Sequence, residues 1–146
     1  MILKIFRSVW FLSLLGVFAV LLLVYASLPD PVVVQEEGVS QTHLGKDVFF
    51  YVALATITIV NAMAYLIKKF YLRDEAFRSW FHGQLITFNI FFVVALSLIN
   101  SFNSGERFDF SRIGFVVYGS VALIVIWAIA WPVVHFYRRF SSKSAV

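Results

Sequence analysis

The chain has 146 residues, of which 61% are hydrophobic, 18% aromatic and 14% charged, and its net charge is +4. Soluble domains average about half apolar and about a quarter charged residues, so this composition excludes an ordinary water-soluble protein and favours a membrane protein. The sequence has no cysteine, which excludes enzymes that work through redox cysteine pairs, disulfide frameworks and thiolate-ligated metal sites.

Four long apolar runs follow one another along the chain, at about 9–28, 48–67, 83–99 and 113–137. A helix of about 20 residues crosses a hydrocarbon core about 30 Å thick. Because hydrocarbon offers no partner for an unpaired peptide group, each run is expected to form a helix. The sequence therefore predicts an all-α fold, a single membrane-embedded four-helix bundle over residues 1–146.

The first run follows Lys4 and Arg7 and passes through Val24-Tyr25-Ala26, which is also the pattern of a signal peptide cut after a small residue. Cleavage there would leave three spans. The run is long for a signal peptide, so we expect it to remain as the first span.

The stretch LPDPVVVQEEGVSQTHLGKD, residues 28–47, joins the first two runs and is far more polar than they are. Pro29 and Pro31 oppose continuation of the first helix, because proline disfavours a helical conformation in the residue before it. The stretch lacks the combination of residues that a catalytic site needs. We expect a structured spacer that can dock a partner outside the membrane.

This layout resembles a bacterial membrane domain of unknown function that occurs in SdpI-like immunity proteins and their relatives. The resemblance covers residues 20–67 and is carried by Leu28, Pro29, Gly38 and Lys46. It implies a small protein of the bacterial inner membrane whose outer loop meets a periplasmic component. The family's histidine soon after the proline has no counterpart, since Val34 and Gln35 occupy that region and His43 comes later.

None of the four runs contains Asp, Glu, Lys or Arg, which argues against a proton-coupled antiporter of the small multidrug type. Asn61 and Asn89 each lie roughly 9 Å from the same membrane boundary and are expected to meet across an antiparallel helix pair. Uncharged polar neighbours of the two are Thr58, Thr87 and Gln84. The group is either interhelical hydrogen bonding worth about 0.6 to 2 kcal/mol, or the lining of a path for a polar ligand or ion.

The loop between the second and third runs reads KKFYLRDEAFRSWFHGQ. It is expected to extend both helices, with Asp74 and Arg78 paired four residues apart on one face. Aromatic residues here and near the last run are candidates for contact with lipid or a partner: Trp80, Phe108, Phe110, Trp127 and Trp131. The segment Asn103-Ser104-Gly105 is typical of a tight turn.

His82 and His135 lie near the same membrane face and are the candidates for a haem or metal ligand. Each lies within about one turn of the end of its apolar run, where histidine usually serves as an amphipathic interface residue. We therefore predict no cofactor and no metal.

Basic residues gather at one side of the predicted bundle: Lys4, Arg7, Lys68, Lys69, Arg73, Arg78, Arg138, Arg139 and Lys143. The positive-inside rule therefore predicts that both termini and the middle loop are cytoplasmic. This asymmetry accounts for the positive charge without a nucleic-acid partner.

The expected function is an accessory or assembly subunit of a larger membrane complex, without catalytic activity, in contact with lipids and with other subunits or a second copy. The alternatives are a small oligomeric channel or transporter for a neutral or lipid-like solute, a haem protein or membrane enzyme, and an immunity-type membrane protein.

Overall fold

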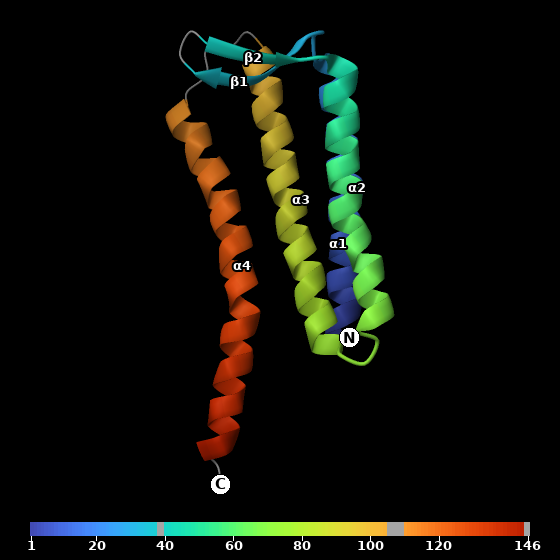
Figure 1. Cartoon of the computed structure of the whole chain (residues 1–146), viewed down its shortest axis with the longest axis vertical. Coiled ribbons are helices and arrows are strands. Elements are labelled where there is room, and N and C mark those ends of the chain that lie inside the picture. The colour runs from blue at the N-terminus through green and yellow to red at the C-terminus, as the bar shows by residue number, and fades with distance from the viewer. Residues whose placement is uncertain (38–39, 105–109, 145–146) are drawn as a thin grey trace.

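The computed structural model describes residues 1–37, 40–104 and 110–144 (Figure 1). Its elements in chain order are α1 (Ile2–Ser27), β1 (Val32–Glu37), β2 (Ser40–Leu44), α2 (Lys46–Phe70), α3 (Glu75–Asn103) and α4 (Phe110–Ser144). Each of the four helices is long and apolar enough to cross a membrane. The prediction of four membrane-spanning helices is thus supported, and the helices extend past the apolar runs into the flanking polar residues.

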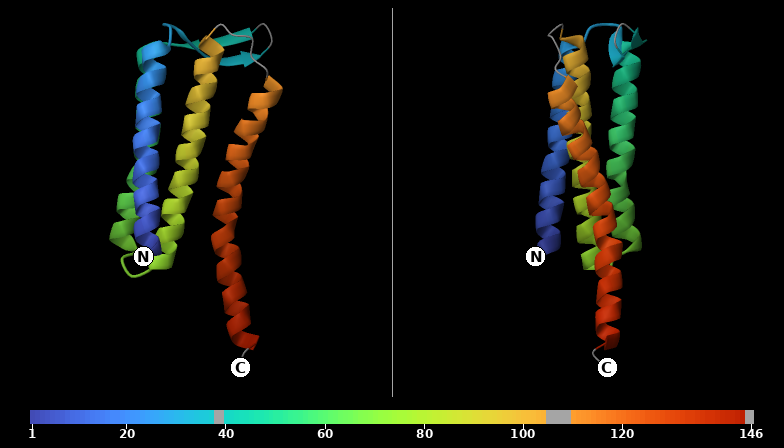
Figure 2. Two further views of the ribbon diagram at one scale, coloured as in Figure 1. Left: turned by 180° about the vertical axis from the view of Figure 1, so that it is seen from behind. Right: turned by 90° about the vertical axis from the view of Figure 1, so that its left-hand side faces the viewer.

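Helix α3 is central in the arrangement. It packs against α1, α2 and α4, and α1 also contacts α2. Helix α4 packs mainly on α3 and stands to one side of the other three, as the left view of Figure 2 shows. The predicted four-helix bundle is therefore a three-helix bundle with a fourth helix attached to one of its members. Both termini lie at the end opposite the strands (Figure 1), and we call these the termini end and the hairpin end.

The apolar core lies toward the hairpin end. Val17, Leu21 and Val24 of α1 pack with Ile57 of α2 and Leu96 of α3. The connecting stretch contributes two further buried side chains to this cluster, Leu28 and Val32. In lipid the hydrophobic effect gives little preference for one helix contact over another, so close packing of this kind is what holds the helices at this end.

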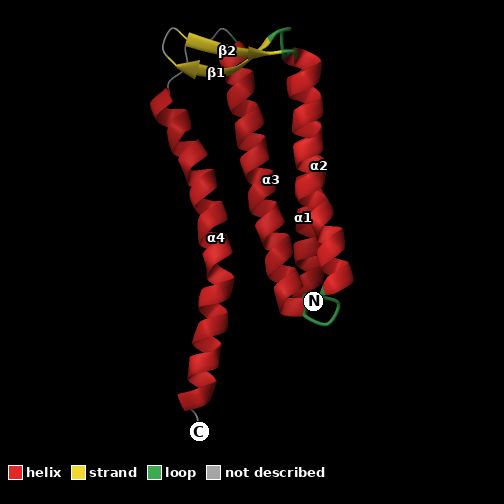
Figure 3. Ribbon diagram, in the orientation of Figure 1, coloured by secondary structure: helices red, strands yellow, loops and turns green. Residues whose placement is uncertain are grey.

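A two-stranded antiparallel hairpin, β1 and β2, crosses the top of the helices (Figure 3). Val32 pairs with Leu44 and Glu37 with Ser40, with an irregularity between Val33 and Gln35. The all-α prediction missed this hairpin. The three successive valines of β1 have high β propensity, and outside the hydrocarbon that propensity is no longer overridden.

The hairpin is held to α3 by a side-chain amide. The Val33 backbone N–H donates to Asn103 Oδ1 over 2.8 Å, and Asn103 Nδ2 donates to the Val33 carbonyl over 2.9 Å. The amide thus bonds the backbone of β1 as a neighbouring strand would. Asn103 is the last residue of α3. The tight turn predicted at Asn103-Ser104-Gly105 includes Gly105, which lies outside the described residues.

The turn between α2 and α3 differs from the expected helical pairing. The Asp74 carboxylate caps α3 by accepting from the Phe77 backbone N–H over 2.9 Å. In the described part of the chain the one salt bridge joins the Met1 amino group to Glu75 at 3.7 Å. Asp74 and Arg78 therefore do not pair, because capping satisfies an otherwise unbonded N–H at the helix start.

Candidate functional site

The two asparagines within the apolar helices α2 and α3 form a reciprocal pair. Asn61 Nδ2 donates to Asn89 Oδ1 over 2.8 Å, and Asn89 Nδ2 donates back to Asn61 Oδ1 over 3.0 Å. Their exposed fractions are 5% and 1%. The interhelical contact expected from the sequence therefore forms, and it consists of two hydrogen bonds.

Helix α1 completes this network. The Trp10 indole Nε1 donates to Asn61 Oδ1 over 2.9 Å, and Asn89 Nδ2 donates to Ser13 Oγ over 2.8 Å. The second N–H of the Asn61 amide goes to the Ile57 carbonyl at 2.9 Å. All four N–H groups of the two amides are thereby used inside the protein. We call Trp10, Ser13, Asn61 and Asn89 the polar core; it joins α1, α2 and α3 by bonds that hydrocarbon cannot replace.

The other three polar candidates lie apart from the polar core. Thr58 is exposed on α2. Gln84 and Thr87 are buried but bond each other, with Gln84 Nε2 donating to Thr87 Oγ1 at 3.3 Å. Gln84 Nε2 also lies 3.4 Å from the Ile124 carbonyl. Gln84 thus links α3 to α4, with Thr87 bonded to it on α3, and neither side chain extends the asparagine pair.

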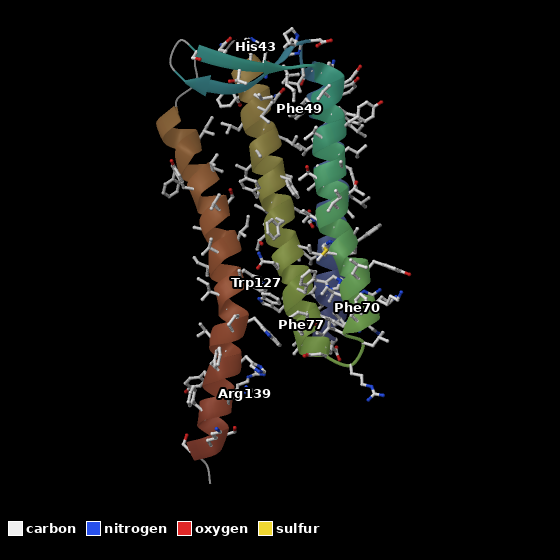
Figure 4. All side chains as sticks on the ribbon, in the orientation of Figure 1. His43, Phe49, Phe70, Phe77, Trp127 and Arg139 are labelled. Carbon is white, nitrogen blue, oxygen red and sulfur yellow. The ribbon has the colours of Figure 1, made fainter. Side chains whose placement is uncertain are left out.

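A second polar junction joins α3 to α4 through two tryptophans. Trp80 Nε1 donates to the Trp127 carbonyl over 2.8 Å, and Trp127 Nε1 donates to the Trp80 carbonyl over 2.9 Å. Gly83 makes room for this exchange, because a Cβ built there would lie 2.4 Å from Trp127 Cζ2. Figure 4 shows Trp127 on α4 directed toward α3.

The predicted aromatic contact residues are partly used within the chain. The ring of Trp131 lies 5.9 Å from Trp80 and 5.7 Å from Phe77, between ring centroids. Together with Trp127, these rings line the α3–α4 contact rather than a surface free for a partner. Phe108 lies outside the described residues, and Phe110 is the first residue of α4.

The two histidines have different surroundings. His82 is buried, and its Nδ1 donates to the Arg78 carbonyl over 2.6 Å, while its ring meets Trp10 edge-on at 5.5 Å. His135 is exposed on α4 and stacks against Trp131. Among the described residues there is no group of three or more His, Asp and Glu side chains that could hold a metal ion.

At the hairpin end, polar groups tie the start of α2 to the end of α1. Asp30 Oδ1 accepts from the Lys46 backbone N–H at 3.2 Å, and the Tyr25 hydroxyl donates to Asp47 at 3.0 Å. Lys46 Nζ lies 4.7 Å above the Tyr25 ring. His43 pairs with Val33 across the hairpin. These contacts fit the expected structured spacer.

Sequence reasoning missed the residues that complete both junctions. Trp10 and Ser13 lie three residues apart in an apolar run, which is the spacing that places two side chains on one helix face. Gly83 lies at the start of a predicted span, where the sequence gives no reason for a glycine. The structure gives the reason, because the Trp127 ring leaves no room for a side chain there. Asn103 was predicted in a tight turn, which agrees with its position at the end of α3. Nothing in the sequence indicated that its side chain bonds the Val33 backbone.

Comparison with family models, with curated proteins and with solved structures found no match to this chain. The resemblance of residues 20–67 to the SdpI-like domain therefore stays a prediction. Of the residues that carry it, Leu28 is buried in the apolar core and Lys46 begins α2, while Gly38 lies outside the described residues.

Proposed function

We propose that this protein is an accessory or assembly subunit of a larger membrane complex and has no catalytic activity of its own. Its partners are membrane lipids and either other membrane-protein subunits or a second copy of the chain, and no nucleic acid. We place it in the bacterial inner membrane, with both termini and the α2–α3 turn in the cytoplasm, because the basic residues gather there.

The observation that carries the proposal is the exposure of α4. In the most apolar 18-residue stretch of α4, only 6% is buried in the protein, whereas the corresponding stretches of the other three helices are 17 to 22% buried. Phe115, Tyr118 and Ile126 are 80, 74 and 66% exposed. Helix α4 is held to its own chain along one face, so most of its surface is available to a transmembrane helix of another subunit.

A glycine on α4 supports a protein neighbour over lipid alone. Gly119 is exposed, and a Cβ built on it would meet nothing within 4 Å. Glycine weakens a helix relative to alanine, and within the described chain no close contact requires it. Small residues are enriched where transmembrane helices approach one another closely. Gly119, next to Tyr118 and one turn from Phe115, thus provides a notch beside two large aromatic side chains.

The channel or transporter alternative draws less support. It requires Asn61 and Asn89 to offer polar groups to a solute, and their N–H groups are already bonded to each other, to Ser13 and to the Ile57 carbonyl. The haem alternative requires two histidines that share a ligand, whereas His82 and His135 pack against different tryptophans.

The test is native mass spectrometry after gentle extraction from the protein's own membrane, together with a photo-crosslinking amino acid at exposed positions. We expect Tyr118 and Ile126 on α4 to yield crosslinks to a membrane protein in fixed ratio. Ile59 and Tyr65, similarly exposed on α2, serve as controls and should yield mainly lipid adducts.

Gly119→Leu should abolish the protein crosslinks by filling the notch, while Gly16→Leu should not. Gly16 is the matched control, since it is also exposed in its helix and a Cβ built on it would have nothing within 4 Å. A lone monomer in the spectrum, with lipid adducts from all four positions, would refute the proposal.

A further inference from the structure

A small cavity opens at the termini end between α1, α2 and α3. Its volume is about 140 Å³. Three basic side chains from the three helices line it: Arg7, Lys68 and Arg78. Trp10, Ala64 and His82 also line it; Ala64 and His82 are buried, and Arg7 and Lys68 are exposed. We call this the basic cavity.

The cations of the basic cavity have no acidic partner in the described part of the chain, where the single salt bridge joins the Met1 amino group to Glu75. Arg78 Nη1 makes one long contact, 3.4 Å, to the Leu72 carbonyl. Arg78 Nε is buried and lacks a hydrogen-bond acceptor. A charged donor without an acceptor is costly, and because Arg78 lines the basic cavity, an anion bound there would give its guanidinium an acceptor.

Two side chains that line the basic cavity, His82 and Trp10, are fixed by contacts within the protein. His82 is fixed by its bond to the Arg78 carbonyl and by its edge contact with Trp10. The Trp10 indole is in turn bonded to Asn61 of the polar core. Because His82 and Trp10 are already held by these contacts, binding here requires no further ordering of these two side chains.

We propose that the basic cavity binds the phosphate group of an anionic membrane lipid. Its volume corresponds to about five water molecules at about 30 Å³ each, which suits a phosphate group while the rest of the headgroup and the acyl chains stay outside. Arginine bonds phosphate through parallel N–H groups. Basic pockets between helices at the cytoplasmic membrane surface are suited to such headgroups.

The positive-inside rule alone does not explain why Arg7, Lys68 and Arg78 meet at one cavity. Lys4, Lys69 and Arg73 lie on the same side of the protein and serve the positive-inside rule equally, yet they do not line the basic cavity. They provide a matched control: three cations, also drawn from α1, α2 and the region leading into α3, outside the site.

The experiment compares the protein with R7Q/K68Q/R78Q and with K4Q/K69Q/R73Q, each purified in a neutral detergent. Native mass spectrometry measures binding of phosphatidylglycerol and of phosphatidylcholine. A cation that contacts the bound phosphate contributes about fivefold to the affinity for an anionic lipid, so the loss of all three in the cavity variant should weaken phosphatidylglycerol binding about a hundredfold. The control variant should stay within a few-fold of the wild type, and phosphatidylcholine should bind weakly to all three.

Two results would overturn the proposal: equal loss of phosphatidylglycerol from both variants, or equal binding of the two lipids to the wild type. Thermal stabilisation by inorganic phosphate and by glycerol phosphate that is lost only in the cavity variant, together with equal binding of the two lipids to the wild type, would assign the site to a soluble anion instead. If the cavity variant does not fold, Arg78→Gln against Arg73→Gln gives the same comparison, with an expected loss of about fivefold.

Discussion

Trp80 and Trp127 exchange hydrogen bonds, each indole N–H donating to the main-chain carbonyl of the other residue, over 2.8 and 2.9 Å. This reciprocal pair is the principal polar link between α3 and α4. Helix α4 has few neighbours in its own chain besides α3, so the pair contributes to where α4 lies. Its loss should therefore affect the position of α4 more than the integrity of the other three helices.

Trp127→Phe should weaken the attachment of α4. The change removes one indole N–H and leaves the Trp80 carbonyl without that donor, at an expected cost of about 1 kcal/mol. Thermal unfolding in detergent measures this cost. Trp131→Phe is the control, because Trp131 packs in the same aromatic group without a hydrogen bond in the described structure. Equal destabilisation by both changes would mean that ring packing, not the exchanged bonds, holds α4.

Gly83→Ala should displace α4 from α3. The new Cβ would lie 2.4 Å from Trp127 Cζ2, and overpacking of this kind costs about 1 to 3 kcal/mol. Because the chain has no cysteine, spin labels on single cysteines at Ile59 and Ile126 report the α2–α4 distance directly. We expect a longer or broader distance distribution.

Gly16→Ala is the comparison for that measurement, since a Cβ at Gly16 has nothing within 4 Å. It should leave the label distance unchanged. An unaltered distribution in Gly83→Ala would show that Trp127 can move aside without shifting its helix.

Asn61→Leu and Asn89→Leu should each destabilise the three-helix bundle by about 1 to 2 kcal/mol, because each leaves the partner amide with unbonded groups. The double change should cost less than the sum, since it removes both members of the reciprocal pair. Thermal unfolding of the wild type, the two single variants and the double variant gives the interaction energy of the pair. Thr58→Val, at an exposed position of α2, should have little effect. Additive costs would mean that the two amides act independently.

Asn103→Leu should free the hairpin from α3. The change removes both bonds to the Val33 backbone. Their loss should lower the free energy of local opening at Val33 by about 1.4 kcal/mol, so its amide hydrogen should exchange about tenfold faster. The neighbouring control is Asn100→Leu, which loses only the bond from Ser27. Unchanged exchange at Val33 would show that strand pairing alone orders the hairpin.

Much of this architecture followed from the sequence because the inferences needed only the length and composition of each segment and the depth of a residue within it. Charge-free apolar runs of membrane-spanning length predict helices wherever no water can bond the backbone. Asn61 and Asn89 were expected to meet because antiparallel helices place residues at equal depth side by side. The hairpin was missed because residues 32–37 and 40–44 form two short strands, the second with exposed polar positions, which is a weak signal beside four strong helical ones.

The sequence by itself determined that the protein has four helices long and apolar enough for a membrane and an interhelical asparagine pair. Only the tertiary structure decided that α4 attaches mainly to α3, through Trp80, Trp127 and the space left by Gly83. It also decided that Arg7, Lys68 and Arg78 converge on one cavity. The physical reason is that helices apolar on nearly every side show no preferred face in their pattern. Their neighbours are chosen by individual close contacts and hydrogen bonds between distant residues.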